Sequence, residues 1–292
     1  MPIDAEKLLA FPIPRGRQIL TPRDTALYAL SIGMGRDPLE REPLRFVDPL
    51  QGPAMMPSMV LVMAHPGFWL SRPDTGVDPE AVLHASQGFE ILAPLPTDGL
   101  IESSTHITDL IDKGPGKAAL ILTKTELTKG AGTVFARLDR TTFVRAGGGF
   151  GGIGTSLQVT QRSAPSGPPE YVIDLPTRPE QALLYRLNGD YNPLHSDPEV
   201  AHRAGFRTPI LHGLCTMGVI GHALMRALAA YRAERVRSMS LRFCNPVLPG
   251  ETIRTEIWED GSFRARALER DIVVADLGTA VVDSAPNAQR SH

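Results

Sequence analysis

A stretch of twenty residues, 214–233, constrains the fold more than any other part of the sequence. Apolar side chains surround most of its helical circumference, and no wide polar face develops before its last turns. Such a helix must be covered on several sides, as it is when a curled sheet wraps around it. No uninterrupted apolar run reaches the ~18–20 residues of a membrane span, so we expect this helix at the core of a protein that does not enter membranes.

Two segments rich in glycine, proline and serine divide the chain. Residues 146–152 are mostly glycine, and residues 162–170 combine small residues with two adjacent prolines, a composition typical of surface linkers. With 292 residues the chain is long for one core and adequate for two, because compact domains have ~100–150 residues. We therefore predict two domains, residues 1–160 and 161–292.

Three features recur in the same order in both halves. The first is a proline-spaced turn that leads into a strand, the second is another β-like segment, and the third is a β-like segment that begins with Gly-Thr. They occupy residues 94–101, 118–123 and 132–136 in the first half, and 246–253, 271–275 and 278–282 in the second. This repetition indicates a duplication.

The first half also has an apolar helix candidate, residues 59–70, but Pro66 and Gly67 interrupt it. We expect this half to be catalytically degenerate, and the second half to retain the better helix. The predicted architecture is α+β, with two antiparallel sheets that are each wrapped around a central helix.

Charge and cysteine content exclude several classes of protein. The formal net charge is −2, so the chain lacks the basic field that favours nucleic acids or anionic membrane surfaces. Cys215 and Cys244 lie beside apolar residues and are expected as free thiols in a reducing compartment. The first residues do not show the pattern of a secretory signal, and we expect a cytoplasmic protein.

Residues 190–195, Asp-Tyr-Asn-Pro-Leu-His, carry the strongest chemical pattern. Gly189 allows a preceding helix to end, and Pro193 disfavours helix at the residue before it, so Asp190 and His195 are expected on a stiff loop. A carboxylate and an imidazole held together suit the transfer of one proton to or from water and another to or from carbon. The same residue types also form ordinary turns, and on these six residues alone both interpretations stay open.

A second element stands directly before the buried helix. His212 and Gly213 precede it, so the N–H groups of Gly213 and Leu214 are expected to be unpaired donors at the helix start. Such donors suit a carbonyl oxygen that gains negative charge during a reaction. Together with the Asp/His loop they predict a site for proton transfer on a thioester.

Longer runs resemble a known family. Residues 185–198 and 205–214 resemble the hydratase 2 motif of MaoC-like (R)-specific enoyl-CoA hydratases. The first half resembles the two-domain form of this family, as found in the hydratase 2 domain of peroxisomal multifunctional enzyme type 2, at Leu83-His84, 94–96, 112–114 and 147–152. The resemblance covers nearly the whole chain and implies a double hotdog fold.

The resemblance also implies an activity, the reversible hydration of trans-2-enoyl-CoA to (3R)-3-hydroxyacyl-CoA. It assigns Asp190 and His195 to a catalytic dyad, Asn192 to holding the site, and the N–H group of Gly213 to polarising the thioester oxygen. Substrate contacts are assigned to His84, Lys113, His212 and Phe243. This chemistry requires no metal or redox cofactor, and we expect none; the partner is an acyl-CoA thioester, and a homodimer is the candidate assembly.

Two positions depart from the family pattern, and both lie in the half that is expected to shape the acyl pocket. The chain has Ala85 and Ser86 where family members commonly have Gly-Glu, and Asp48 where some relatives have a glutamate. These differences leave the acyl chain of the substrate open.

Other hypotheses compete with hydration. Four histidines within 28 residues raise a metal site, but no tight ligand spacing such as His-Glu-x-x-His occurs; they are His195, His202, His212 and His222. A hotdog acyl-CoA thioesterase and a non-catalytic acyl-CoA-binding protein are the alternatives to a hydratase. Residues 147–152 do not form a dinucleotide site, because the strand and helix context of such a site is absent.

Overall fold

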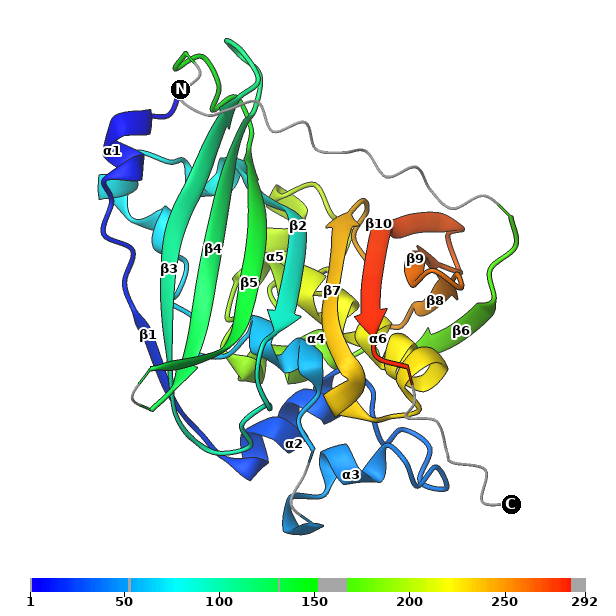
Figure 1. The fold of residues 1–292 in the computed structure, drawn as a ribbon. Helices are drawn as coiled ribbons and strands as arrows, with labels where there is room; N and C mark the ends of the chain where they lie inside the picture. Colours follow the sequence, from blue (N-terminus) through cyan, green and yellow to red (C-terminus); the bar gives the residue numbers. More distant parts are fainter. Residues whose placement is uncertain (1, 52–53, 131, 152–166, 285–292) are drawn as a thin grey trace.

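The strands form one continuous antiparallel sheet. The computed structural model describes residues 2–51, 54–130, 132–151 and 167–284, and within them ten strands follow the order β1-β3-β4-β5-β2-β7-β10-β9-β8-β6 (Figure 1). All neighbouring strands run antiparallel. The strands are β1 Gly16–Leu20, β2 Val82–Ile91, β3 Gly99–Asp112, β4 Ala119–Lys129, β5 Thr133–Val144, β6 Tyr171–Pro176, β7 Val236–Phe243, β8 Thr252–Ile257, β9 Ser262–Ala267 and β10 Ile272–Val282.

The two halves of the sheet share one topology. From one edge the order is β1-β3-β4-β5-β2, and from the other edge it is β6-β8-β9-β10-β7, so strands of equal rank occupy equal places. This repetition supports the duplication that the sequence indicates. The α+β class is as predicted, with one difference: the sheets of the two halves are joined where β2 pairs with β7, from Ser86↔Arg242 to Glu90↔Ser238. The pairing satisfies N–H and C=O groups that two separate sheets would leave unpaired at their edges.

One part of the predicted repeat is wrong. Residues 272–275 and 278–282 are not two segments, because both belong to β10, which continues through a register shift between Ala275 and Gly278. A Cβ atom at Gly278 would lie 2.3 Å from the ring of Phe263, so this glycine permits a close approach inside the sheet rather than a turn. The topological counterpart of β4 is β9, which carries no repeated sequence feature.

The predicted buried helix is present in the second half. Helix α6, Gly213–Leu224, is followed by a π-helical turn, Met225–Ala229, and the chain leaves the helix at Ala230 in the left-handed conformation. Every residue from Cys215 to Leu224 is buried. The helix contacts β6, β7 and β8 of its own half, so the apolar circumference is covered on several sides as expected.

The predicted α-helix at residues 59–70 is wrong. The chain instead forms two short 3₁₀ helices, Pro57–Leu61 and Trp69–Ser71. The prolines in this region remove backbone donors, and Gly67 adopts a positive φ of 79°, so a continuous α-helix cannot form. The first of these 3₁₀ helices is buried and contacts β2, β5 and α6. The core of the first half therefore contains one short 3₁₀ turn where the second half contains α6.

A helix that the sequence did not reveal packs against α6. This helix is α2, Pro22–Ser31. A Cβ atom on Gly218 of α6 would lie 3.0 Å from Tyr28, which is in α2, and 2.5 Å from Ile32, which directly follows α2. The other α-helices are α1 Ala5–Leu9, α3 Leu44–Val47, α4 Gln181–Tyr185 and α5 Pro198–Arg203. Among the described residues, no helix is long and apolar enough to cross a membrane.

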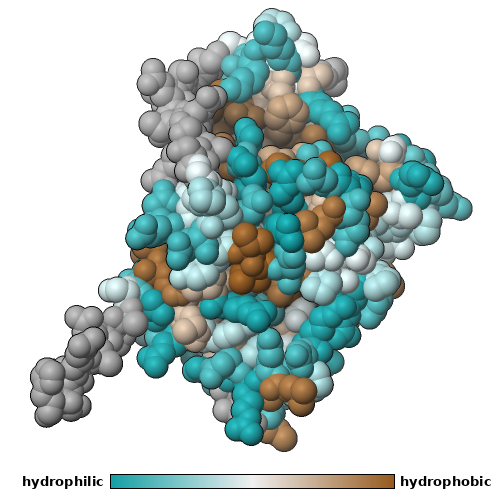
Figure 2. Space-filling view, turned by 90° about the vertical axis from the view of Figure 1, so that its right-hand side faces the viewer, coloured by the Kyte–Doolittle hydropathy of each residue, from teal (hydrophilic) through white to brown (hydrophobic). Residues whose placement is uncertain are grey.

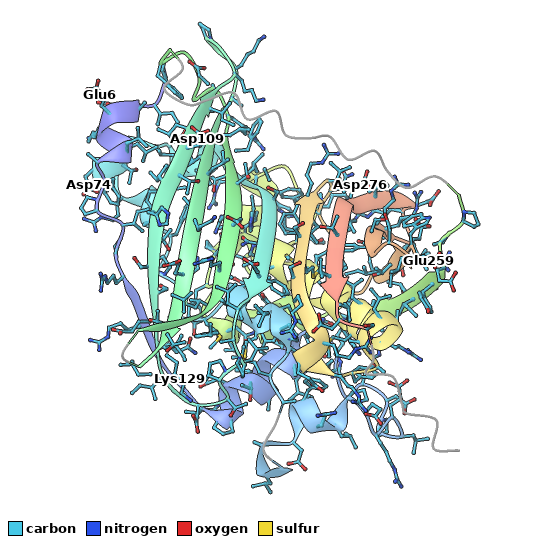
Figure 3. The ribbon with its side chains drawn as sticks, in the orientation of Figure 1. Glu6, Asp74, Asp109, Lys129, Glu259 and Asp276 are labelled. Atoms are coloured by element: carbon cyan, nitrogen blue, oxygen red, sulfur yellow. The ribbon has the colours of Figure 1, made fainter. Side chains whose placement is uncertain are left out.

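One face of the molecule is mainly polar. The face in Figure 2 is largely hydrophilic, with apolar residues in small groups between polar ones. Ion pairs lie along the sheet, such as Lys129 with Asp98 and Arg264 with Asp276; Lys129 and Asp276 are labelled in Figure 3. The exposed pair of Lys129 with Asp98 contributes little to stability. The predicted domain boundary at residue 160 and most of the predicted linker 162–170 lie outside the described residues.

Candidate active site

The loop at residues 190–195 is built from two side-chain-capped turns. The 3₁₀ turn before it, Arg186–Asn188, ends at Gly189 with a φ of 109°, as the sequence predicts. The N–H group of Asn192 donates to Asp190 Oδ1 at 3.2 Å, and the N–H group of Leu194 donates to Asn192 Oδ1 at 3.0 Å. Asn192 is exposed and caps the 3₁₀ helix that ends at His195. The role of Asn192 is therefore explained by an ordinary turn. Asp190 uses only Oδ1 in this turn, so its second carboxylate oxygen is not engaged by it.

His195 is held in one tautomer. It is only 8% exposed, and its Nδ1 lies 2.8 Å from the carbonyl oxygen of Ile210. A carbonyl oxygen can only accept, so Nδ1 carries the proton and the neutral ring presents the lone pair of Nε2. Burial lowers the pKa of His195, although this hydrogen bond and the charge of Asp190 oppose the shift. His195 is therefore uncharged at pH 7, with a free lone pair on Nε2.

His212 stacks on His195. The ring centroids are 3.8 Å apart and the planes differ by 29°. His212 Nε2 donates to the backbone oxygen of Asp190 at 3.2 Å, and the ring of Tyr185 covers it with a centroid distance of 5.0 Å. Burial and the neighbouring His195 lower the pKa of His212 to about 4. Its Nδ1 is buried without a partner among the described residues.

The fold gathers three groups that the sequence separates. One ligand-type atom from each of Asp190, His195 and His212 lies within 4.8 Å of the other two. Such a group can hold a metal ion, although the ligand spacing in the sequence did not predict one. A ring nitrogen of each histidine is already engaged by a backbone carbonyl, which leaves one nitrogen per ring for a proton or an ion.

The cluster of Asp190, His195 and His212 is one wall of the candidate site. A second wall beside it consists of Gly213, Phe243 and His84. Gly213 is the first residue of α6, and a Cβ atom on it would lie 3.4 Å from the ring of Phe243. The ring of Phe243 lies 4.8 Å from that of His84, and His84 Nε2 donates to Gln87 Oε1 at 3.0 Å. His84 comes from β2 and Phe243 from β7, so this wall crosses the junction between the halves.

Lys113 lies apart from both walls, on the turn between β3 and β4. It is exposed, and its side chain has no hydrogen-bond or ion-pair partner in the described part of the chain. The residue before it, Asp112, accepts hydrogen bonds from the N–H groups of Gly114, Gly149 and Gly151. These bonds lower the pKa of Asp112.

The Asp112 carboxylate explains the glycine-rich segment as well. A Cβ atom on Gly148 would lie 2.6 Å from the carbonyl oxygen of Gly114 and 2.7 Å from Asp112 Oδ1. The segment therefore needs glycine in order to close around Asp112, next to Lys113. The part of 146–152 that is described is thus a packed loop rather than only a break between domains.

Sequence reasoning missed Arg140 and His65, which both interact electrostatically with Asp190. Arg140 lies on β5, and its charge interacts with Asp190, His84 and His65. Two histidines have lowered pKa values: the pKa of His65 falls to about 4, and the pKa of His84 falls well below its usual value. In both cases burial is the largest cause and the charge of Arg140 is the second. Arg140 occupies the same face of the strand as the buried Leu138 and Thr142. That alternation was the available signal, since arginine is rare at an inward-facing position.

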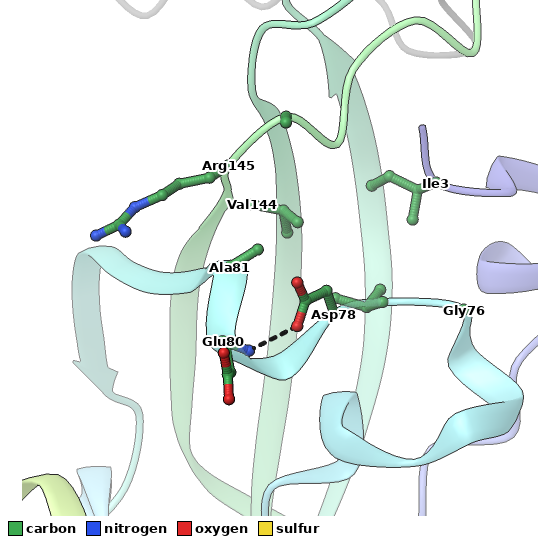
Figure 4. A pocket seen from close by; sticks show the side chains of 9 residues that line it. Ile3, Gly76, Asp78, Glu80, Ala81, Val144 and Arg145 are labelled. Carbon is green, nitrogen blue, oxygen red and sulfur yellow. Dashed lines mark hydrogen bonds between the residues drawn. The ribbon is translucent and has the colours of Figure 1, made fainter. Parts of the chain in front are cut away.

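A separate cavity of about 310 Å³ lies away from these residues (Figure 4). It is bounded by the end of β5, the 3₁₀ turn Pro79–Ala81 and the N-terminal segment at Ile3. Asp78 caps the N–H group of Glu80 at 3.0 Å, so its carboxylate is used by the local turn. None of the residues assigned to the site from the sequence lines this cavity.

Comparisons with known proteins match both halves. The MaoC like domain matches residues 160–280, and the MFE-2 hydratase 2 N-terminal domain matches residues 19–146. The enoyl-CoA hydratase ChsH3 of Mycobacterium tuberculosis is 39% identical over 292 residues, which cover 97% of each chain. The chain belongs to the MaoC-like hydratase 2 family.

Solved structures agree with this MaoC-like hydratase 2 assignment. A MaoC-like dehydratase from Phytophthora capsici is 33% identical, with a TM-score of 0.84 and coverage of 97% of this chain and 100% of that chain. A Mycobacterium tuberculosis protein described as a double hotdog fold is 16% identical, with a TM-score of 0.53 and coverage of 94% and 89%, and it shows the fold alone. Within the family match, His84 belongs to the N-terminal hydratase 2 region and Asp190, His195 and Phe243 belong to the MaoC-like region. The candidate site therefore draws on both regions.

Proposed function

We propose that this chain catalyses the reversible hydration of trans-2-enoyl-CoA to (3R)-3-hydroxyacyl-CoA. The observation that carries the proposal is the position of Asp190 and His195 beside His212 and Gly213 at the start of the buried helix α6. This arrangement puts two proton-transfer groups next to backbone donors that suit a thioester oxygen. Relatives named enoyl-CoA hydratase support the same reaction.

In the proposed mechanism Asp190 and His195 share two proton transfers. The pair removes a proton from water as the water oxygen bonds to C3 and the double bond becomes an enolate, and the protonated pair then delivers a proton to C2, so that the pair ends in the state in which it began. The N–H group of Gly213 stabilises the enolate charge on the thioester oxygen between these events. Positioned acid and base groups typically contribute ~10²–10⁴ in rate, and one oxyanion donor ~10²–10³.

The second wall and Lys113 take substrate-binding roles in this proposal. His84, His212 and Phe243 contact the substrate, and Lys113 binds a CoA phosphate. Partial exposure of His84 and Phe243 supports access from solvent. We also propose domains of 1–160 and 161–292, a homodimer and a cytoplasmic location; light scattering of the purified protein tests the dimer.

A direct assay separates this function from its alternatives. Hydration removes the ultraviolet absorbance of the enoyl thioester, and the 3-hydroxyacyl product is resolved into its (R) and (S) forms on a chiral column. A thioesterase would instead release free CoA, which a thiol reagent detects. A binding protein would change neither signal. The proposal expects loss of absorbance, an (R) product and no free thiol; an (S) product or thiol release would overturn it.

A further inference from the structure

Arg140 is a cation on the inner face of the sheet, and none of the described residues forms an ion pair with it. It pairs in register with Gln87 on β2 and with Thr123 on β4, and both of these neighbours are buried. Its Nε atom is buried and has no hydrogen-bond partner, and no ion pair or hydrogen bond joins its guanidinium to any described residue. Gln87 cannot serve it, because its amide group already donates to the carbonyl oxygens of Gly88 and Asp139 and accepts from His84.

A guanidinium whose Nε is buried and unpaired is stabilised when an anion joins it. Arginine stays charged at all physiological pH values, and although Arg140 as a whole is only partly buried, the burial of its Nε without a partner carries a desolvation penalty. The partial exposure leaves the rest of the guanidinium within reach of a ligand. The negative charge of Asp190 acts on Arg140, although the two groups form no ion pair. Because Asp190 belongs to the catalytic cluster, the position next to Arg140 lies within the field of the reacting groups.

The CoA phosphates do not account for this cation. Asp112, Ala119 and Val144 lie level with one another across the sheet, and Lys113 follows Asp112. Arg140 lies four residues before Val144 on β5, which corresponds to about 13 Å along the strand. The proposed phosphate site at Lys113 and the guanidinium are therefore at different depths, and Arg140 lies on the side of Asp190.

We propose that Arg140 binds a carboxylate on the acyl chain, so that the preferred substrates are trans-2-enoyl-CoA thioesters of dicarboxylic acids. This proposal rests on the proposed function and specifies its substrate class. A guanidinium presents paired N–H donors that match a carboxylate in a bidentate geometry. His65 and His84, which lie within the field of Arg140 and have lowered pKa values, stay neutral and add no competing charge.

Matched pairs of substrates test the proposal. Crotonyl-CoA is compared with the mono-CoA thioester of fumaric acid, and trans-2-hexenoyl-CoA with the mono-CoA thioester of trans-2-hexenedioic acid. Each is assayed with the wild-type chain, Arg140→Met, Arg140→Lys and a control, Arg137→Met. Arg137 lies on the same strand, is half exposed and pairs with Glu126. Since Arg140 has no partner to leave behind, replacement by methionine is expected to preserve the fold, which thermal unfolding verifies.

The wild-type chain is expected to favour the carboxylated member of at least one pair. Arg140→Met lowers kcat/KM for that substrate by roughly 10- to 100-fold, the usual effect of a hydrogen-bonded charge, and changes the neutral partner by less than about threefold. Arg140→Lys retains part of the preference, because it keeps the charge and loses the planar fork. Arg137→Met behaves as wild type.

Three results would overturn the proposal: no preference within either pair, an equal loss for neutral and carboxylated substrates in Arg140→Met, or no effect of that substitution. Binding of succinyl-CoA and butyryl-CoA, measured by calorimetry, keeps the test independent of catalysis. If no thioester is hydrated, the proposed function fails, and the dependence of succinyl-CoA affinity on Arg140 still decides whether this residue binds a carboxylate.

Discussion

The imidazole rings of His195 and His212 stack with their centroids 3.8 Å apart, and each ring donates one N–H group to a backbone carbonyl. The two acceptors are the oxygens of Ile210 and Asp190. Two stacked rings favour the neutral state, because protonation of one is opposed by burial and disfavours protonation of the other. The arrangement leaves the lone pair on Nε2 of His195 free, and one ring nitrogen of His195 lies within 4.8 Å of a carboxylate oxygen of Asp190.

This stacking predicts how stability depends on pH. The folded-state pKa of His212 is about 4 and its unfolded value is about 6.5, so the unfolded chain binds the proton more tightly between these values. The contribution of His212 is complete above pH 6.5 and is lost as the pH falls toward 4. Urea unfolding from pH 4 to 8 should show that His212→Gln reduces this slope by about 1.4 kcal/mol per pH unit.

The exposed His106 provides the control for this measurement. His106→Gln removes a histidine outside the cluster and is measured in parallel, so that the effect of losing any histidine is separated from the effect of losing His212. An equal slope in wild type and His212→Gln would show that His212 is protonated as readily in the folded chain as in the unfolded one.

Close packing between α2 and α6 predicts a severe effect at one glycine. Gly218→Ala places a methyl group 2.5 Å from Ile32, and overpacking of this kind costs about 1–3 kcal/mol. Gly221 lies on the same helix, where a methyl group would meet Ser58 at an ordinary 3.4 Å. Thermal unfolding should show a lower Tm for Gly218→Ala and an unchanged or higher Tm for Gly221→Ala, since alanine favours helix over glycine. Equal values for the two variants would contradict the packing described.

The proposed phosphate contact predicts a change in KM alone. Lys113→Met should raise KM for a CoA thioester by about 3- to 10-fold, because a charge-assisted contact is lost, and should leave kcat unchanged. The pantetheine thioester of the same acid, which lacks the nucleotide phosphates, should show no change. Lys117 is exposed on the same turn and gives the matched control, Lys117→Met. A rise in KM for both thioesters would place the effect of Lys113 elsewhere.

The three-residue cluster also predicts a response to chelation. Hydration by proton transfer requires no ion, so dialysis against EDTA should leave kcat unchanged, and elemental analysis should find less than about 0.1 metal ions per chain after dialysis. Loss of activity with EDTA and recovery with zinc would instead assign Asp190, His195 and His212 as metal ligands.

Local patterns predicted the turns around the candidate site, but they did not predict how the two halves of the sheet join. The turn residues Gly189 and Pro193, and His212-Gly213 before the apolar run, act within a few residues of one another, so the sequence contains their geometry. Pairing of β2 with β7 depends on strands far apart in the chain, and no local pattern records it. The 3₁₀ turns near Pro57 formed where apolar periodicity had favoured an α-helix.

Arg140 shows a different limit of the sequence. Its importance depends on which face of β5 it occupies and on the absence of a counter-ion, and both are properties of the assembled sheet. The alternation from Leu138 to Thr142 gave the face, but the missing partner could only be recognised once Gln87 and Thr123 were placed beside it.

The turnover of Asp190→Asn tests the central claim most directly. The substitution keeps an oxygen that can accept from the N–H group of Asn192, so the loop should keep its fold, which the near-ultraviolet circular dichroism spectrum verifies. We predict that kcat for trans-2-enoyl-CoA hydration falls by at least about 100-fold. A folded Asp190→Asn variant that hydrates the substrate at more than about a third of the wild-type rate would contradict the claim that this carboxylate transfers a proton.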